Sequence, residues 1–161
     1  MHLKNNFNYN MIKGRVAEAI IKELFHVNGY RVYNYGMENT LPQVVDNVKF
    51  LKDEIASSVR QMPDYLVQHV ETGELAYVEV KYRALGRFDY SNVKNHPYPN
   101  TYFIIVSKEN IQCISYIELR QGITLPDDEN HNLENCDFFK LEKVKVNEYT
   151  EYSKVFFKGV V

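Results

Sequence analysis

Two runs rich in β-branched and aromatic residues flank a short polar turn near the middle of the chain. The first run covers residues 65–70 and the second covers residues 75–82, with Glu-Thr-Gly-Glu at 71–74 between them. A Thr-Gly step between two such runs is typical of a β-hairpin. The pattern therefore predicts two adjacent antiparallel strands.

The register of this hairpin decides which side chains share a face of the sheet. A loop centred on the Thr-Gly step pairs Val70 with Leu75 and, counted outward, Asp64 with Lys81. Opposed residues share a face, as do residues two apart on one strand, so Glu79 joins them. We expect two carboxylates and one ammonium group to cluster at the open end of the hairpin, whereas a slip of one residue would move Asp64 to the other face.

A helical pattern precedes the hairpin, because apolar residues recur at helical spacing between residues 13 and 28. Gly29 follows as a typical helix stop. Glu18 falls on the margin of the apolar stripe, where its carboxylate can face a cleft, although an ordinary exposed glutamate fits the same position. The stripe consists of Val16, Ala17, Ile20, Ile21, Leu24 and Val27.

A second helical pattern lies in the segment 37–62, where the apolar positions fit a helix that begins near Thr40. Such a helix can pack on the core, line a nucleic-acid cleft or form a dimer face, and core packing is the default. Its apolar positions are Val44, Val45, Val48, Leu51, Ile55 and Val59.

Loops and strands follow the hairpin. Residues 84–100 contain glycine and proline among polar residues and predict a loop. Residues 101–107 are almost all apolar, which indicates a strand buried on both faces of the sheet. Further β-rich runs stand at 111–117, 138–146 and 155–161. We therefore predict an α/β fold with a mixed central sheet flanked by helices, an inserted helix and extra C-terminal strands.

The composition fits one small domain that spans residues 1–161. With 45% apolar residues the chain can bury a core, and it is too short for two domains. It shows no signal-peptide pattern and no apolar run long enough to cross a bilayer, so we expect a soluble cytoplasmic protein without a membrane partner. The two cysteines make no metal-type spacing with histidine, so zinc is not indicated, and Cys113 is expected to be a buried free thiol.

The predicted cluster suits a particular chemistry. The carboxylate oxygens of Asp64 and Glu79, joined by the backbone carbonyl of Val80, suit Mg²⁺ or Mn²⁺. Such an ion polarises a phosphodiester and acidifies water. Lys81 can orient that water or stabilise negative charge in the transition state. The alternative is that Lys81 only pairs with Glu79 on a solvated strand face.

Three short segments together resemble a known family. Residues 13–18 read Lys-Gly-Arg-Val-Ala-Glu, residues 63–64 read Pro-Asp and residues 79–81 read Glu-Val-Lys. This combination resembles the PD-(D/E)xK, or restriction-endonuclease-like, nuclease superfamily, and its opening is most similar to archaeal Holliday junction resolvases. The resemblance covers about half of the chain. It implies a restriction-endonuclease-like core, a magnesium-dependent endonuclease that hydrolyses DNA phosphodiester bonds, and a homodimer.

The resemblance also implies a role for each motif residue. Glu18 would assist metal binding, and Asp64 and Glu79 would hold the ion together with the Val80 carbonyl. Lys81 would serve the attacking water. The segment 37–62 is longer than the corresponding link in compact resolvases, so it leaves the form of the substrate open.

The charge distribution separates a basic part from an acidic part. The formal net charge is −2, which is unlike a strongly basic nucleic-acid-binding domain. Basic residues nevertheless dominate the stretch after the predicted site, and the acids gather later, at 127–129 and 134–137. A basic rim would follow a nucleic-acid backbone, although a solvated surface of mixed sign is the alternative. The residues assigned to nucleic-acid contact are Lys13, Arg15, Arg83, Arg87 and Lys94.

Two other functions stay open at this point. A nuclease-like fold can act as a binding or assembly module without catalysis, which would fit the acidic overall charge and the segment 37–62. An RNA nuclease would use the same acidic and basic residues as a DNA nuclease.

Overall fold

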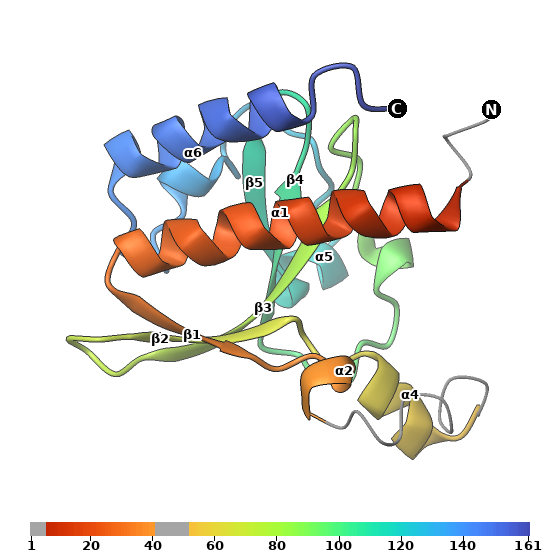
Figure 1. The fold of residues 1–161 in the computed structure, drawn as a ribbon. Coiled ribbons are helices and arrows are strands. Elements are labelled where there is room, and N and C mark those ends of the chain that lie inside the picture. The colour runs from red at the N-terminus through yellow and green to blue at the C-terminus, as the bar shows by residue number, and fades with distance from the viewer. Residues whose placement is uncertain (1–5, 41–51) are drawn as a thin grey trace.

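The computed structural model of the protein describes residues 6–40 and 52–161 (Figure 1). Its centre is a mixed sheet of five strands, which lie side by side in chain order. β3 and β4 run parallel, whereas every other neighbouring pair in this sheet is antiparallel. The strands are β1 (Tyr30–Asn34), β2 (Tyr65–His69), β3 (Leu75–Tyr82), β4 (Thr101–Val106) and β5 (Ile111–Ser115).

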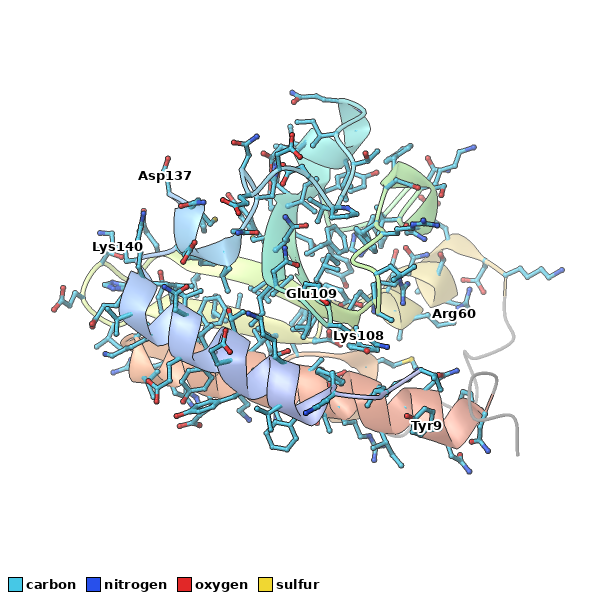
Figure 2. The ribbon with its side chains drawn as sticks, turned by 90° about the horizontal axis from the view of Figure 1, so that it is seen from above. Tyr9, Arg60, Lys108, Glu109, Asp137 and Lys140 are labelled. Atoms are coloured by element: carbon cyan, nitrogen blue, oxygen red, sulfur yellow. The ribbon has the colours of Figure 1, made fainter. Side chains whose placement is uncertain are left out.

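Helices cover both faces of the sheet. α1 (Phe7–Val27) and α6 (Lys143–Phe156) lie side by side over one face (Figure 1, Figure 2). The short α5 (Tyr116–Arg120) and the 3-10 turn η2 (Tyr90–Asn92) pack on the other face. In the described residues no helix combines the length and the apolar character that crossing a membrane requires. The shorter described elements are α2 (Met37–Thr40), α4 (Glu54–Arg60) and η3 (Leu133–Asn135).

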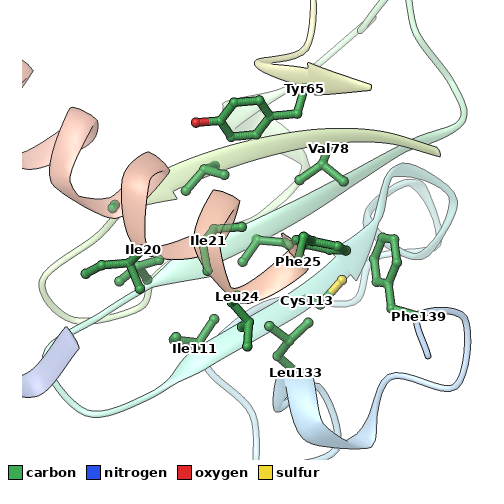
Figure 3. Packing of buried hydrophobic residues seen from close by; sticks show 14 of the residues in the cluster. Ile20, Ile21, Leu24, Phe25, Tyr65, Val78, Ile111, Cys113, Leu133 and Phe139 are labelled. Carbon is green, nitrogen blue, oxygen red and sulfur yellow. The ribbon is translucent and has the colours of Figure 1, made fainter. Parts of the chain in front are cut away.

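The larger core lies between α1 and the sheet (Figure 3). α1 buries most of its predicted stripe, because apolar residues return to the same side at every third or fourth position, but Val27 at the end of the stripe is exposed. Phe25 packs edge to face against Tyr30 and Phe139, with ring centroids 5.1 Å and 5.0 Å apart. One side chain of α1 thus joins β1 to the segment that leads into α6.

The sheet separates this core from a second core on its other face. Val80 belongs to the core under α1, whereas Phe103 and Ile105 belong to the core on the opposite face. Phe103 and Ile105 are the register partners of Glu79 and Lys81 on the neighbouring strand. Because side chains alternate along a strand, Glu79 and Lys81 project away from α1.

The predicted hairpin is present, but its register is shifted by two residues. The His69 N–H donates to the Glu74 carbonyl over 3.0 Å and closes a four-residue loop. The last residue of this loop is the glycine, with a φ of +73°, a conformation that glycine adopts without steric cost. Leu75 therefore pairs with Gln68 and not with Val70.

α1 begins earlier than the apolar pattern predicts. Asn6 caps the helix by accepting a hydrogen bond from the Tyr9 N–H (3.1 Å), and the helix starts at Phe7. The first turns of α1 carry exposed apolar residues such as Phe7 and Ile12. These residues pack on neither core, so they do not continue the apolar stripe from which the helix was predicted.

The segment 37–62 does not hold one continuous helix from Thr40. Asp53 has extended backbone and caps α4 by accepting a hydrogen bond from the Ala56 N–H (2.9 Å), so a new helix begins at Glu54. The part of the predicted helix at 41–51 lies outside the described residues.

β4 confirms the predicted buried strand, because five of its six residues are buried and it lies inside the sheet. The next strand is shorter than predicted. Ser115 caps α5 by accepting a hydrogen bond from the Glu118 N–H (3.2 Å), so β5 ends there. Cys113 is a buried free thiol, as expected.

The predicted C-terminal strands at 138–146 and 155–161 are wrong. Most of this region forms α6. Its valine and aromatic content favours a strand by propensity, but Val146, Ser153 and Phe157 are buried at helical spacing. The helical spacing of these buried residues therefore outweighs the strand propensity of the region.

Candidate active site

Asp64 is held at the start of β2 by four hydrogen bonds. Its carbonyl accepts from the N–H groups of Tyr35 (2.9 Å) and Gly36 (3.3 Å). Its own N–H donates to Glu79 Oε2 (3.0 Å), and its Oδ2 accepts from the Val80 N–H (2.8 Å). These bonds fix the Asp64 carboxylate against the middle of β3.

The predicted pairing of Asp64 with Lys81 is wrong, but the predicted cluster is present. Tyr65 pairs with Val78, so the register continued by one residue places Asp64 opposite Glu79. A shift of two residues keeps every side chain on its face, because the side-chain period of a strand is two. Asp64, Glu79 and Lys81 therefore still meet.

Glu79 links the other two members of the cluster. Its Oε2 accepts from the Asp64 N–H, and its Oε1 accepts a hydrogen bond from Lys81 Nζ within an ion pair. The Glu79 side chain is 13% exposed and that of Lys81 is 36% exposed. The pair thus lies at the margin of the core and not on an open, fully solvated strand face. A buried carboxylate needs such partners to offset its lost hydration.

Glu18 lies on α1, close enough to the cluster to interact with it electrostatically. It is half-buried beside the apolar stripe, as expected, and the Tyr65 hydroxyl donates to its backbone carbonyl over 3.2 Å. Its carboxylate interacts electrostatically with Lys81, Glu38 and Glu79. The structure therefore brings all four predicted side chains into one electrostatic neighbourhood, with Glu18 the outermost.

Glu38 is an acid of this neighbourhood that sequence reasoning missed. It lies on α2, and a Cβ built on Gly36 would be 3.4 Å from Glu38 Oε2 and 3.9 Å from the Asp64 Cα. Glu38 also raises the pKa of Glu18. No motif marks Glu38, because its position depends on how the chain turns after β1.

Burial and the charges of neighbouring groups shift the pKa values of the ionisable side chains in the cluster. Burial, followed by the Glu79 carboxylate, raises the pKa of Asp64 to about 8. Burial also raises the pKa of Glu18. For Lys81, burial opposes the charge, but the Glu79 and Asp64 carboxylates outweigh burial and raise its pKa. The site thus holds excess acidic groups that a further cation would favour in their ionised form.

The donor set fits a hard divalent cation that keeps some of its waters. In the described residues no group of three or more histidine, cysteine, aspartate or glutamate side chains is arranged to hold a metal ion, so Glu18 does not complete a ligand set with Asp64 and Glu79. The N–H of Val80 points toward Asp64, and its carbonyl shares that edge, because both groups of one strand residue face the same neighbour. Asp64, Glu79 and this carbonyl thus supply oxygens on one side, and Mg²⁺ accepts water for the remainder.

A cleft opens beside Glu79 and Lys81. It has a volume of about 330 Å³, and its lining includes three basic side chains and one acidic side chain. The basic ones are Arg60, Lys81 and Lys94, and the acidic one is Glu79. Arg60 lies at the end of α4 (Figure 2), and no sequence motif marks it, because only the fold brings it here.

The residues predicted to contact nucleic acid fall in different places. Lys94 lines the cleft, whereas Arg83 and Arg87 line a separate hollow with Lys108. Lys13 Nζ donates to the Val161 carbonyl over 2.7 Å, beside that second hollow. Arg15 is exposed on α1 and interacts electrostatically with Glu18. Arg83 stands two residues after Lys81 and interacts electrostatically with it, against the net rise in the Lys81 pKa.

His96 is a further cleft residue that the sequence did not reveal. Its ring packs edge to face on Phe103 with centroids 5.4 Å apart, and its Nδ1 accepts from the Tyr98 N–H (3.1 Å). Burial lowers the pKa of His96, against the opposing effect of Glu79. A neutral imidazole therefore lines the cleft near neutral pH.

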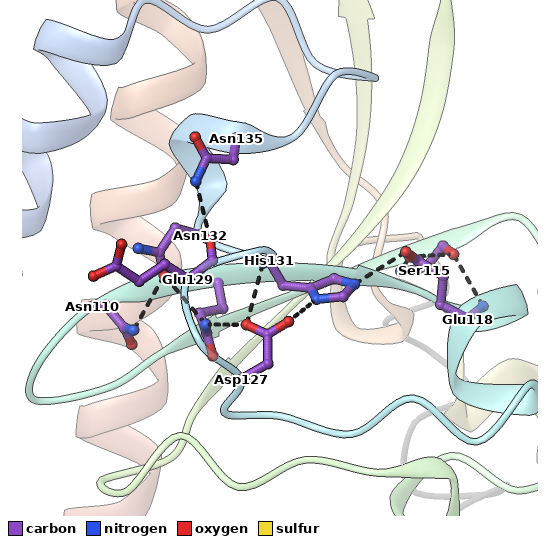
Figure 4. A network of polar contacts seen from close by, with 9 residues as sticks. Asn110, Ser115, Glu118, Asp127, Glu129, His131, Asn132 and Asn135 are labelled. Atoms are coloured by element: carbon purple, nitrogen blue, oxygen red, sulfur yellow. Dashed lines mark hydrogen bonds and ion pairs between the residues drawn. The ribbon is translucent and has the colours of Figure 1, made fainter.

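A second polar network orders the loop after α5 (Figure 4). His131 bonds Asp127 through Nδ1 and Glu118 through Nε2, the latter over 3.1 Å. Burial opposes the His131 charge, but hydrogen bonds to the two carboxylates outweigh burial and raise its pKa. Because Glu118 also closes the capping box of α5 with Ser115, this network holds the loop in place.

No protein-family model matches the chain, and no curated protein matches it. Function is therefore inferred from the geometry of the site.

Divalent-cation binding is expected to strengthen with pH. A cation binds the ionised Asp64 carboxylate, whose pKa of about 8 means that binding at pH 6 must expel a proton. Affinity for Mn²⁺, measured by calorimetry, should rise by up to about tenfold per pH unit between pH 6 and pH 8. A flat affinity over this range, or the same affinity in Asp64→Asn, would place the cation elsewhere.

Proposed function

We propose that the protein is a metal-dependent endonuclease that hydrolyses phosphodiester bonds of DNA. The observation that carries the proposal is the linked arrangement of Asp64, Glu79 and Lys81, in which Glu79 bonds both the Asp64 backbone and the Lys81 ammonium group. The resemblance of the same residues to the PD-(D/E)xK superfamily supports it. So does the α/β sheet, whose β2–β3 hairpin carries these residues.

Each residue of the site has its own proposed role in hydrolysis. Asp64, Glu79 and the Val80 carbonyl would hold a Mg²⁺ or Mn²⁺ ion, and Glu18 would assist its binding from α1. When bound, such an ion polarises the scissile phosphate and lowers the pKa of water. Lys81 donates a hydrogen bond to the attacking water or to the phosphate oxygen on which negative charge develops. The attacking water gives up one proton to solvent and its oxygen bonds to phosphorus, while the bond from phosphorus to the leaving oxygen breaks and the leaving oxygen takes a proton from solvent.

The cleft beside Lys81 fits a phosphate backbone. Arg60 and Lys94 place positive charge on its walls, next to the ion pair of Glu79 and Lys81. Contacts of this kind position a nucleic acid without reading its sequence. The second hollow, with Arg83 and Arg87, extends positive charge beyond the site.

Removing the cleft cations should weaken DNA binding and its salt dependence. The variant Arg60→Ala with Lys94→Ala is expected to lower the slope of log Kd against log salt by about 0.9 for each phosphate that is no longer neutralised. Fluorescence anisotropy in EDTA, where metal-dependent hydrolysis does not proceed, measures this slope. Lys140→Ala is the matched control, because Lys140 is exposed and lies at the end of the molecule opposite Arg60 (Figure 2). An unchanged slope in the double variant would remove the cleft from the DNA path.

A substrate panel tests the activity and identifies its substrate. Pure protein is incubated with supercoiled plasmid, linear duplex, single-stranded DNA, a four-way junction and RNA, each with Mg²⁺, Mn²⁺ or EDTA. Cleavage of DNA that needs the cation and is lost in Glu79→Gln supports the proposal. Cleavage of RNA alone would change the substrate class, and no cleavage of any substrate would leave a binding module.

A further inference from the structure

The two cysteines of the chain lie side by side although they are far apart in sequence. Cys113 is in the middle of β5 and buried in the core under α1, and Cys136 follows η3 (Figure 3 shows Cys113). Their Sγ atoms are 4.0 Å apart and share a hydrogen bond, and both thiols are free. The fold thus places two reduced sulfurs in direct contact.

Cys136 has the surroundings of a reactive thiolate. The hydrogen bond that it shares with the Cys113 thiol, followed by those that its sulfur accepts from the N–H groups of Phe139 and Phe138, lowers its pKa to about 6. Cys136 is only partly buried, and it lines a hollow of about 360 Å³ with Cys113, His131 and the acids Glu118 and Asp137, of which Glu118 opposes the lowering of its pKa. Reagents from solvent can therefore reach this sulfur.

Cys113 has the opposite character. It is only 4% exposed, although it lines the inner wall of the same hollow, and its hydrogen bond to Cys136 together with burial raises its pKa. A thiol of this kind does not react with a dissolved oxidant first, because the thiolate is the nucleophile. It can, however, attack a neighbouring sulfur that has already been oxidised.

We propose that Cys136 is a site of oxidation by hydroperoxides and that Cys113 resolves the product into a disulfide within the chain. A low-pKa, accessible thiol beside a resolving cysteine is the arrangement that makes oxidation selective and reversible. The hollow at Cys136 shares no lining residue with the cleft at Glu79 and Lys81. The modification site is therefore independent of the proposed nuclease function.

The chemistry has two balanced steps. The Cys136 thiolate attacks one oxygen of hydrogen peroxide, the O–O bond breaks, and the hydroxide that leaves takes a proton to form water. The Cys113 sulfur then attacks Cys136 sulfenic acid, and the S–O bond breaks. The departing hydroxide takes the Cys113 proton and forms a second water. The two thiols lose two hydrogen atoms in total, and peroxide is reduced.

Disulfide formation requires a modest movement. A disulfide has an S–S distance of about 2 Å, so the sulfurs must approach by about 2 Å. Cys113 is fixed in the sheet, whereas Cys136 stands between η3 and the residues that lead to α6. The segment of Cys136 is therefore the part that moves.

Peroxide treatment followed by mass spectrometry tests the proposal. Wild-type protein exposed to hydrogen peroxide should lose the mass of two hydrogen atoms, with a Cys113–Cys136 cross-linked peptide that dithiothreitol reverses. Cys113→Ser should instead accumulate sulfenic acid at Cys136, trapped by dimedone, and Cys136→Ser should give neither product. Alkylation of Cys136 by iodoacetamide in native protein should rise to a plateau with a midpoint near pH 6.

Other outcomes overturn the proposal. Alkylation of Cys136 only in denatured protein would show that its sulfur is not accessible. Equal dimedone labelling in wild type and Cys113→Ser would show that Cys113 does not resolve the sulfenic acid. Neither result depends on whether the protein cleaves DNA.

Discussion

Asp64→Asn is expected to slow metal-dependent DNA cleavage by about 100-fold or more, the loss that several kcal/mol of missing charge stabilisation produces. The substitution keeps the shape of the side chain and its hydrogen bond from the Val80 N–H, but it removes the charge that would hold the cation. Single-turnover cleavage measures the effect. Asp128→Asn is the control, because Asp128 is exposed in the loop after α5 and far from the site in sequence.

The same substitution is expected to stabilise the cation-free protein in alkaline solution. The folded pKa of Asp64, about 8, lies above its ordinary value of 3.8, so folding favours the protonated form. The contribution of Asp64 to the free energy of unfolding is therefore fully present below pH 3.8. It is lost as the pH rises through 8. The asparagine side chain of the variant resembles the protonated acid at every pH, so the variant should melt at a higher temperature than wild type at pH 9 in EDTA.

Cleavage and thermal stability measured on the same variant separate function from folding. A variant that loses cleavage and gains thermal stability cannot have failed to fold. Wild-type cleavage by Asp64→Asn would show that the carboxylate takes no part in the reaction. Equal melting temperatures for the two proteins at pH 9 would show that the buried charge is compensated by other groups.

Phe25→Ala is expected to cost about 3–5 kcal/mol in the free energy of unfolding. Phe25 is 1% exposed and makes edge-to-face contacts with Tyr30 and Phe139. Its removal leaves a cavity where α1, β1 and the segment before α6 meet. Because small domains are stable by about 5–15 kcal/mol, this is a large share of the total.

Urea denaturation followed by circular dichroism measures the loss. Phe156→Ala is the matched control, because Phe156 is 64% exposed at the end of α6 and should change stability by no more than about 0.5 kcal/mol. Similar losses in both variants would show that α1 does not pack on the C-terminal segment as described.

The sequence predicts which side chains form the site, but it does not predict which residues of the two hairpin strands pair. The alternation of side chains alone places Asp64, Glu79 and Lys81 on one face for any even shift of the hairpin. The shift itself depends on the glycine, which takes a positive φ as the last residue of the loop and so moves the four-residue loop back by one position. The alternation of side chains therefore determines which face of the sheet carries the site, and the geometry of the turn determines which residues of the hairpin pair.

Contacts between distant parts of the chain could not be predicted. The sequence pattern predicts strands where α6 forms, because valines at 144, 146 and 155 favour a strand, whereas the buried face of α6 has helical spacing. Arg60, His96 and Glu38 reach the site from three separate segments, and nothing in their local sequence marks them. Such residues are identified only once the sheet order is known.

Cleavage of supercoiled plasmid by wild-type protein and Glu79→Gln, each in Mn²⁺ and in EDTA, tests the central claim most directly. We predict nicked or linear product from wild type in Mn²⁺ alone, and at least about 100-fold slower cleavage by Glu79→Gln. Cleavage that continues in EDTA, or that Glu79→Gln carries out at the wild-type rate, would contradict a metal-dependent site built on Asp64, Glu79 and Lys81.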